Sequence, residues 1–456
     1  MECGDMLELK RDIYEKLIEW KKADSGNVLE LNGARQVGKT FILDKFAREN
    51  YKKYFYINMM QTSGKEFIEC YHAATKWKPG EKRIERPLHR TFELFDNTFA
   101  DDKNTIVVID EIQESAEVYS MIRQFAREFS CHFVVTGSYL GKTLSKEYFL
   151  PAGDIDTMVL DTLSYEEFLE TVGLRNVYDN LDLYGQGKPE EYEELKKWYD
   201  VYIQIGGYPA VVKCYLEMKD MEKCKEELAN IIRIFVSESE RYFDAVLEMN
   251  LFEQIFPSIA QSMIKESKGS SDLVSELSKI IFKEESDRVT KKSVNQAIAW
   301  LYRSHIIGYC DKLNECNIME VSFHSRFYFR DIGVARYFLR MTGADRATME
   351  GIVNENFVYL YLERLIRGQK LAGMSPAFGV YKGGEIDFFV RSLENYKDYA
   401  IEVKSGKNIG KTANMILKDG KADYLYLLKG DTHGGIVDKK KYTVPIYLTG
   451  KITFDK

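Results

Sequence analysis

Residues 33–40 read GARQVGKT, and residues 105–111 read TIVVIDE. The first stretch is a complete GxxxxGK(S/T) pattern, whose backbone N–H groups can surround phosphate oxygens. The second is an apolar run ending in Asp-Glu, which a phosphate-loop ATPase needs to hold magnesium and to orient water. Together the two stretches predict a P-loop NTPase fold that binds ATP with Mg²⁺.

The glycine-rich stretch is preceded by residues 28–31, VLEL, which predict a buried strand leading into the loop. Gly33 and Gly38 permit the turn, and a helix beginning near Lys39 would place its positive end beside the phosphates. Lys39 is expected to reach the β- and γ-phosphates, and the Thr40 hydroxyl to bind Mg²⁺. The predicted nucleotide contacts are Gly33, Ala34, Arg35, Gln36, Val37, Gly38, Lys39, Thr40, Asp110 and Ser138.

The Asp-Glu stretch begins with the β-branched run IVVI at residues 106–109, which predicts a strand buried on both faces. Asp110 and Glu111 follow at its carboxyl end, where open α/β sheets place ligands. Asp110 is expected to hold Mg²⁺, and Glu111 to be the catalytic residue that activates water. A further strand-like run at residues 131–138 ends at Ser138, which could sense the γ-phosphate. A chance glycine-rich turn would not explain this whole ordered series.

The composition is that of a globular protein large enough for two or three domains, with 456 residues, 45% of them hydrophobic and 30% charged. A net charge of −7 removes the simplest argument for a general nucleic-acid binder. No apolar run reaches the length of a membrane span, and the first residues lack the apolar core of a signal peptide. We therefore expect a cytoplasmic protein without a membrane partner. Its seven scattered cysteines fit reduced thiols rather than a zinc site.

Four segments are predicted along the chain, all within an α/β class. Residues 1–160 alternate strand-like and helix-like stretches and predict the P-loop domain with a parallel sheet. Residues 161–275 predict a helical region, opened by a capping box at Ser164 and Glu167. Residues 276–345 contain a helix followed by two strand-like runs, which indicates a winged-helix-like module that either binds DNA or packs against the ATPase. Residues 346–456 predict an α/β domain of helix-strand-strand-strand-helix-strand order.

This last segment carries a second group of chemically active residues. Residues 384–390 read GEIDFFV and residues 401–404 read IEVK. If these two strands pair, Asp387, Glu402 and Lys404 can converge at one end, because side chains alternate along a strand. Glu355, on the preceding helix, could add a further ligand. Carboxylates of this kind can hold Mg²⁺ on a phosphate while a lysine steers water.

The arrangement is similar to that of the PD-(D/E)xK nucleases. On this interpretation Asp387, Glu402 and Lys404 are catalytic, and Glu355, Asp387 and Glu402 bind the metal, as Thr40 and Asp110 do in the first site. The motif is short, and any hairpin with one polar face contains such residues. The element order around it favours the nuclease-like fold more strongly than it favours cleavage.

Nine fragments in order resemble the signatures of a large prokaryotic group of AAA-type ATPases: GARQVGKT, VIDEIQ, VVTGSYL, LSYEEFL, GGYPAVV, FYFRDIG, GIVNENFVYLYLE, GEIDFFV and IEVKSGK. The resemblance implies an AAA-type core, a helical region, a winged-helix-like module and a C-terminal domain of unknown function with a nuclease-like core. In one departure, Asp154 follows the LPAG stretch where such proteins commonly carry a basic residue. This puts a phosphate-sensing role at that position in doubt. Arg123 and Arg127 are not assigned as arginine fingers, because surface ion pairing explains them equally well.

Three functional hypotheses follow. The first is an Mg²⁺-dependent ATPase whose nucleotide state controls a nuclease-like domain acting on DNA or RNA. The second is a nucleotide-dependent switch whose C-terminal domain only binds a protein or nucleic-acid partner. The third is a P-loop fold that has lost hydrolysis, which the intact Asp110-Glu111 pair disfavours. Assembly into a homo-oligomer remains open.

Overall fold

The computed structural model describes residues 8–76, 84–138, 153–243, 251–265, 273–281, 291–404 and 410–456. The chain forms two compact units. One comprises residues 11–161, and the other comprises residues 162–456 together with the N-terminal residues 1–10. In the described part of the chain, no helix is long and apolar enough to cross a membrane.

The unit of residues 11–161 contains a five-stranded sheet. Its order is β2 (Lys53–Asn58), β3 (Thr105–Asp110), β4 (His132–Thr136), β1 (Val28–Asn32) and β5 (Ile155–Val159). All neighbouring strands are parallel, as the alternation of strands and helices predicts. Every residue of β3 and β4 is buried, which is typical of parallel strands covered on both faces.

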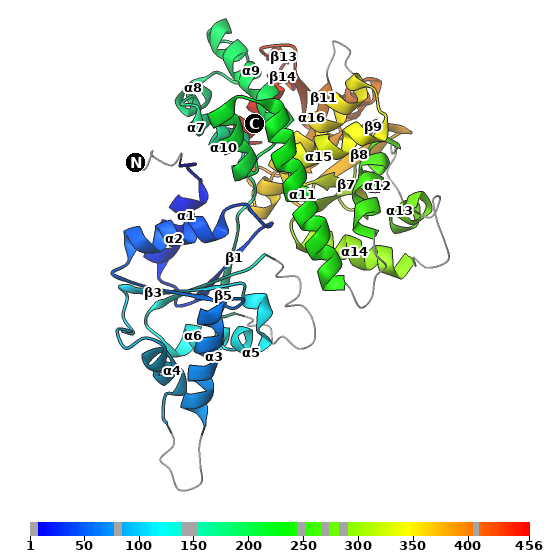
Figure 1. The fold of residues 1–456 in the computed structure, drawn as a ribbon. Helices are drawn as coiled ribbons and strands as arrows, with labels where there is room; N and C mark the ends of the chain where they lie inside the picture. The colour runs from blue at the N-terminus through cyan, green and yellow to red at the C-terminus, as the bar shows by residue number, and fades with distance from the viewer. Residues whose placement is uncertain are drawn as a thin grey trace. The chain divides into compact units, whose positions relative to one another are not determined.

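Helices cover both faces of this sheet (Figure 1). One face carries α1 (Ile13–Ala23) and α2 (Lys39–Asn50). The other carries α3 (Thr62–Thr75), α4 (Pro87–Phe95), α5 (Ala116–Ser120) and α6 (Ile122–Glu128). An aromatic core between the second layer and the sheet includes Phe67, Phe92, Phe125 and Phe133. The carboxyl ends of the strands therefore rest on a rigid, well-packed support.

The second unit begins with helices, as the sequence predicts for this region. They are α7 (Tyr165–Thr171), α8 (Arg175–Asn180), α9 (Pro189–Ile205), α10 (Pro209–Met218), α11 (Met221–Phe243), α12 (Leu251–Lys265), α13 (Leu273–Ile281) and α14 (Lys291–Arg303). The predicted capping box opens α7: Glu167 N–H donates to the Ser164 side chain, and the Glu167 carboxylate accepts from Ser164 N–H. Both bonds satisfy backbone groups that a helix end leaves unpaired.

The helix α14 is followed by an antiparallel hairpin, β6 (Ile307–Asn314) and β7 (Val321–Phe329). This hairpin does not stand alone. Its strand β6 also pairs in parallel with β8 (Ala377–Tyr381), which pairs with β9 (Gly384–Ile386). A four-stranded sheet of order β7-β6-β8-β9 thus joins the hairpin to the last segment. Between them lie α15 (Ile332–Leu339) and α16 (Arg346–Arg367).

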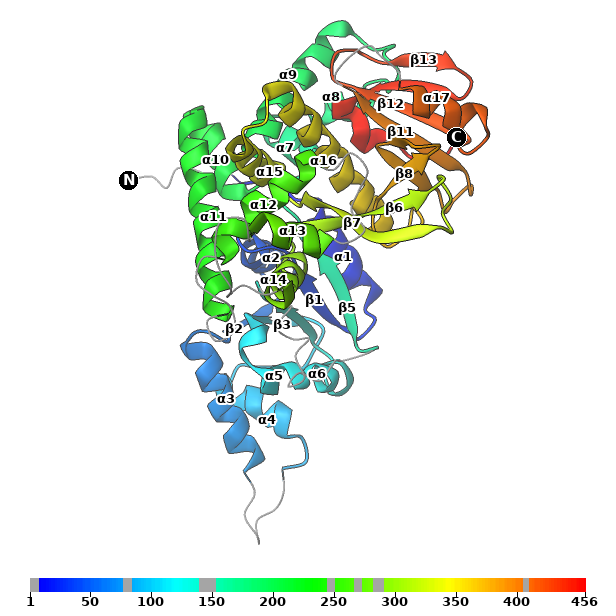
Figure 2. The same ribbon diagram turned by 90° about the vertical axis from the view of Figure 1, so that its right-hand side faces the viewer.

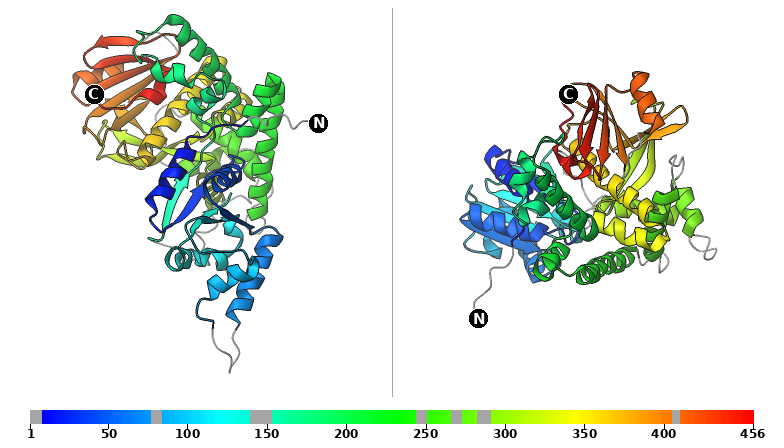
Figure 3. Two further views of the ribbon diagram at one scale, coloured as in Figure 1. Left: turned by 90° about the vertical axis from the view of Figure 1, so that its left-hand side faces the viewer. Right: turned by 90° about the horizontal axis from the view of Figure 1, so that it is seen from above.

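A second mixed sheet completes this unit. Its order is β10 (Phe388–Arg391), β11 (Asp398–Lys404), β12 (Tyr424–Lys429), β14 (Lys441–Pro445) and β13 (Gly435–Asp438). These strands, drawn in orange and red, lie side by side (Figures 2 and 3). The helix α17 (Lys411–Lys418) packs against β11 and β12. The single strand predicted near residues 385–390 is divided at Asp387, because β9 and β10 belong to different sheets.

Candidate functional site

The glycine-rich loop connects the end of β1 to the start of α2. Gly33 has φ +145°, and a Cβ there would lie 2.1 Å from the backbone oxygen of Leu160. Gly38 has φ +96° and is the residue just before α2. Both positions therefore require glycine for a geometric reason, close backbone approach at one and a left-handed turn at the other.

Lys39 is buried, and its Nζ donates to the backbone oxygens of Gly33 and Ala34, each at 2.8 Å. Burial lowers the pKa of Lys39 to about 8, while the nearby Glu111 and Asp110 carboxylates oppose that shift. The ammonium group thus lies inside the loop at the point where the sequence predicts phosphate oxygens. The loop is also braced from outside, because Arg11 donates to the Val37 backbone oxygen at 2.9 Å. Arg11 was not foreseen from the sequence.

Asp110 lies at the carboxyl end of β3 and is buried. Its Oδ2 accepts hydrogen bonds from the Thr40 hydroxyl at 2.8 Å and from the Tyr56 hydroxyl at 2.7 Å. The structure thus brings together the two predicted magnesium residues, Thr40 and Asp110. Tyr56 is a third residue of this group. The sequence motifs did not indicate it, because it lies on β2, outside both of them.

Glu111 directly follows β3 and has a left-handed backbone, with φ +51°. Its carboxylate accepts from Gln113 Nε2 at 2.6 Å and from the Ser138 hydroxyl at 3.1 Å. Two hydrogen bonds therefore orient the predicted catalytic carboxylate. Ser138, predicted as a nucleotide contact, is placed beside Glu111 at the end of the neighbouring strand. Gln113 is an additional residue, and its place in the VIDEIQ fragment is the signal that could have indicated it.

These residues fit magnesium and a nucleoside triphosphate. The loop supplies backbone N–H groups and an ammonium for phosphate, and Thr40 and Asp110 supply the oxygen ligands that Mg²⁺ prefers. Bound Mg²⁺ would neutralise charge on the β- and γ-phosphates. The pair of Thr40 and Asp110 already lies within hydrogen-bond distance, so little rearrangement is needed to share one ion.

The departure at Asp154 has a structural explanation. Asp154 is buried, and its carboxylate accepts from Arg127 at 2.8 and 3.2 Å and lies 3.4 Å from Arg123. Such a two-pronged guanidinium contact satisfies the buried acid. Arg123 and Arg127 are thus engaged within their own unit. The three residues preceding Gly153 in the LPAG stretch lie outside the described residues.

The second group of predicted residues gathers in the other unit, where β10 pairs with β11 in antiparallel register. Lys404 Nζ lies 2.7 Å from Glu402 Oε1, and both residues belong to β11. Asp387 occupies the break between β9 and β10, and its Oδ2 accepts from the Val403 backbone N–H at 2.6 Å. That bond ties the break between β9 and β10 to the carboxyl-terminal end of β11. The structure thus brings Asp387, Glu402 and Lys404 together near the carboxyl-terminal end of β11.

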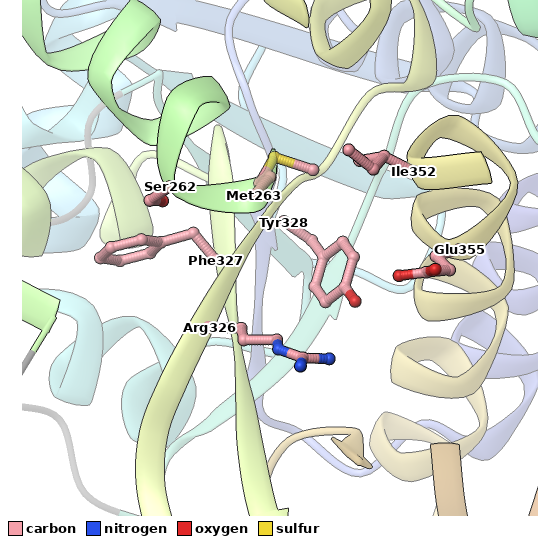
Figure 4. Close-up of a pocket in the computed structure, with 7 residues that line it drawn as sticks. All are labelled: Ser262, Met263, Arg326, Phe327, Tyr328, Ile352 and Glu355. Carbon is pink, nitrogen blue, oxygen red and sulfur yellow. The ribbon is translucent and has the colours of Figure 1, made fainter. Parts of the chain in front are cut away.

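We call Glu355, Asp387, Glu402 and Lys404 the carboxylate cluster. Two charged neighbours that the sequence did not indicate lie next to it. Arg326, on β7, donates to Glu385 Oε2 at 2.6 Å, and its guanidinium lies 3.8 Å from the centre of the Phe378 ring. Figure 4 shows the Glu355 carboxylate on α16 facing the ring of Tyr328, with the Arg326 guanidinium extending into the same space. All three line one small pocket.

The carboxylates of this cluster hold protons more tightly than usual. Burial raises the pKa of Glu355 to about 8, with the charge of Asp387 adding to the effect. Burial likewise raises the pKa of Glu402 to about 7, with Asp387 adding and Lys404 opposing. Excess negative charge has therefore been concentrated in one place, which a proton or a cation would relieve.

The donors of the cluster fit a hard cation in chemistry, and Glu402 Oε2 is a buried oxygen without a hydrogen-bond partner among the described residues. Yet within the described ranges no group of three or more His, Cys, Asp or Glu residues is arranged to hold a metal ion. The predicted set of Glu355, Asp387 and Glu402 is therefore not assembled as a metal site here. Mg²⁺ commonly takes only one or two protein carboxylates and completes its shell with water and phosphate oxygens.

The sequence comparisons agree with the loop geometry. Residues 25–169 match the family described as an AAA domain, and this range contains Gly33–Thr40, Asp110, Glu111 and Ser138. Residues 25–169 form an AAA-type ATPase domain. The AAA domain extends from just before β1 into α7. Residues 196–345 match a different family, a domain of unknown function (DUF8612), and this range ends just before α16.

No curated protein matches the chain by sequence. Among solved structures, the chain is similar to the ORC2 protein of Aeropyrum pernix in ADPNP-ADP complexes, with a TM-score of 0.39, 14% identity, and coverage of 77% of this chain and 96% of that one. It is also similar to the RuvB Holliday junction branch migration motor of Thermotoga maritima, with a TM-score of 0.30, 13% identity, and coverage of 66% and 90%. Likenesses this weak support no statement about the present chain.

Proposed function

We propose that the AAA domain binds Mg²⁺-ATP and hydrolyses it. The observation that supports this most strongly is the 2.8 Å contact between Thr40 Oγ1 and Asp110 Oδ2, two residues from separate motifs that a nucleotide-bound Mg²⁺ requires together. Lys39 holds the β- and γ-phosphates. Glu111, oriented by Gln113 and Ser138, polarises the attacking water.

Phosphate release from ATP by the full chain tests this proposal. Glu111→Gln keeps the size of the side chain but removes the carboxylate, so hydrolysis is expected to fall at least about a hundredfold while ATP still binds. Glu114→Gln, three residues further on, is the matched control and should retain hydrolysis. Equal turnover in Glu111→Gln and the unmodified chain would contradict the proposed role. Absence of phosphate release from the unmodified chain would favour the fold that has lost hydrolysis.

We further propose that the carboxylate cluster is a nuclease-like site, and that the nucleotide state of the AAA domain controls its action on DNA or RNA. The convergence of Asp387, Glu402 and Lys404 supports this proposal, together with the raised pKa values of Glu355 and Glu402. Asp387 and Glu402 would hold a divalent ion on a phosphate, with Glu355 close by. Lys404 would stabilise the negative charge that develops on the phosphate.

Cleavage of single- and double-stranded DNA and RNA, with Mg²⁺ or Mn²⁺ and with or without ATP, tests the second proposal. Asp387→Asn and Lys404→Met should abolish cleavage and leave ATP turnover intact. Lys382→Met, which removes a surface lysine paired with Asp419, is the control for loss of one positive charge. Intact nucleic acid under all conditions would instead favour a nucleotide-dependent switch. In that case ATP should change affinity for a partner, and the acidic substitutions should have no effect.

A further inference from the structure

A polar cavity of about 350 Å³ lies between α9, α15 and α16, within the unit of residues 162–456. Its charged lining consists of Lys196 and Asp200 on α9, Arg336 on α15, and Arg346 and Glu350 on α16. None of the residues assigned above to the nucleotide site or the carboxylate cluster lines it. The size falls within the range of small-molecule sites, roughly 300–1,000 Å³.

Four of these charges form two ion pairs. Lys196 Nζ lies 2.6 Å from Asp200, and Arg346 Nε lies 2.7 Å from Glu350. These four side chains are partly or largely exposed. The charges of these two pairs cancel, so the lining carries a single net positive charge, that of Arg336.

Arg336 is only 8% exposed. Its Nε and Nη1 are buried and have no hydrogen-bond partner among the residues that the structure describes. Burial lowers the pKa of Arg336, as do the nearby Arg340 and Arg346, while the Glu350 and Asp200 carboxylates oppose the shift. A buried guanidinium with two unsatisfied donor groups is unfavourable, and an anion in the cavity would satisfy both of them.

The lining of the same cavity offers a further donor. The Tyr199 hydroxyl donates to Asn354 Oδ1 at 2.8 Å, which fixes that amide so that its Nδ2 is the group left to donate. Asn354 also lines the cavity. The cavity thus presents a planar, two-pronged cation and an amide donor, the groups that bind planar carboxylates or phosphate oxygens.

We propose that this cavity binds a small organic anion, whose phosphate or carboxylate group is held by Arg336. The single unbalanced positive charge suits a ligand with one anionic group. It does not suit a polyanion such as nucleic acid, for which an extended basic surface is needed. The site is independent of both functions proposed above.

Binding is tested by following thermal unfolding of the full-length chain while inorganic phosphate or acetate is added. Lys39→Ala serves as the background, so that the nucleotide loop does not contribute. A saturable rise in Tm is expected, with phosphate if the natural ligand is a phosphate ester and with acetate if it is a carboxylate. Further replacement Arg336→Met should remove this rise and increase the starting Tm, because a buried charge with unsatisfied donors is gone. Arg340→Met, a neighbouring arginine outside the cavity lining, is the matched control and should keep the rise.

A second variant covers the case in which Arg336→Met does not fold. Asn354→Asp keeps Arg336 and places a carboxylate inside the cavity, so the apparent affinity for either anion should fall at least about tenfold, which corresponds to about 1.4 kcal/mol. A response that is unchanged in both variants would show general salt stabilisation and overturn the proposal. A lack of any saturable response to either anion would overturn it as well.

Discussion

The hydroxyl of Tyr56 donates a hydrogen bond of 2.7 Å to Oδ2 of Asp110. Burial raises the pKa of Tyr56 further above neutrality, so the hydroxyl remains a donor wherever the protein is folded. The oxygen that it contacts is the one that also accepts from Thr40. The aromatic residue on β2 therefore positions the carboxylate that is proposed to hold Mg²⁺.

Removing only this hydroxyl should weaken the proposed magnesium site. Tyr56→Phe is expected to raise the Mg²⁺ concentration needed for half-maximal ATP hydrolysis by about 10- to 100-fold, the usual effect of losing a residue that orients a metal ligand. Tyr54→Phe, on the same strand with its ring against that of Tyr56, is the control and should leave the Mg²⁺ requirement unchanged. An identical Mg²⁺ dependence in Tyr56→Phe and the unmodified chain would assign the hydrogen bond a purely structural role.

The affinity for ATP should depend on pH through Lys39. Its pKa is lowered to about 8, chiefly by burial, so the neutral form accumulates as the pH rises past this value. Because phosphates bind the charged form, nucleotide affinity should fall about tenfold between roughly pH 7 and pH 9. Titration of the chain with a fluorescent ATP analogue at both pH values measures this change. Lys39→Arg, which stays charged, should lose the pH dependence whatever its absolute affinity.

The unit that contains the carboxylate cluster should become less stable as the pH rises. Glu355 has a folded-state pKa raised to about 8, above its ordinary value of 4.5, so its proton is bound more tightly in the folded chain. The resulting penalty is absent below the ordinary value and fully present above the raised one. Glu355→Gln should therefore gain stability relative to the unmodified chain from roughly pH 5 to pH 9. Urea unfolding at both pH values tests this, and a constant difference would contradict it.

Asn356, the neighbour of Glu355 on α16, should be important for stability. Its side-chain amide accepts from the Phe329 backbone N–H at 3.0 Å and donates to the Phe329 backbone oxygen at 2.8 Å, and the residue is fully buried. Asn356→Leu would leave both backbone groups unpaired, at a cost of about 2 to 4 kcal/mol in unfolding free energy. Chemical denaturation gives this value. Asn414→Leu, a partly buried asparagine on α17, should cost much less.

The sequence predicts those parts of both sites that depend on short-range patterns. The loop, Lys39 and Thr40 follow one another on the chain, and parallel strands carry Asp110 and Ser138 to the same sheet edge. Tyr56 could not be assigned in this way, because its role depends on β2 pairing with β3. Arg326 and Glu385 were missed for the same reason, since they meet only through sheet pairing.

Asp387 shows the limit more clearly. The alternation of residues 385–390 predicts one strand, and strand periodicity carries no information about which partner each half selects. In the structure the chain leaves one sheet and enters another at this residue, which bonds to Val403. The convergence of Asp387 with Glu402 was predicted, but the division of the strand was not.

The parallel pairing of β6 with β8 determines where this polypeptide can be cut. A fragment that begins after residue 345 would contain β8 but not β6, and would expose an open strand edge to solvent. The complementary fragment would keep β6 but lose β8, the strand that pairs with it. Limited proteolysis or separate expression at this junction should give aggregating pieces, because the cut divides the sheet that β6 and β8 share.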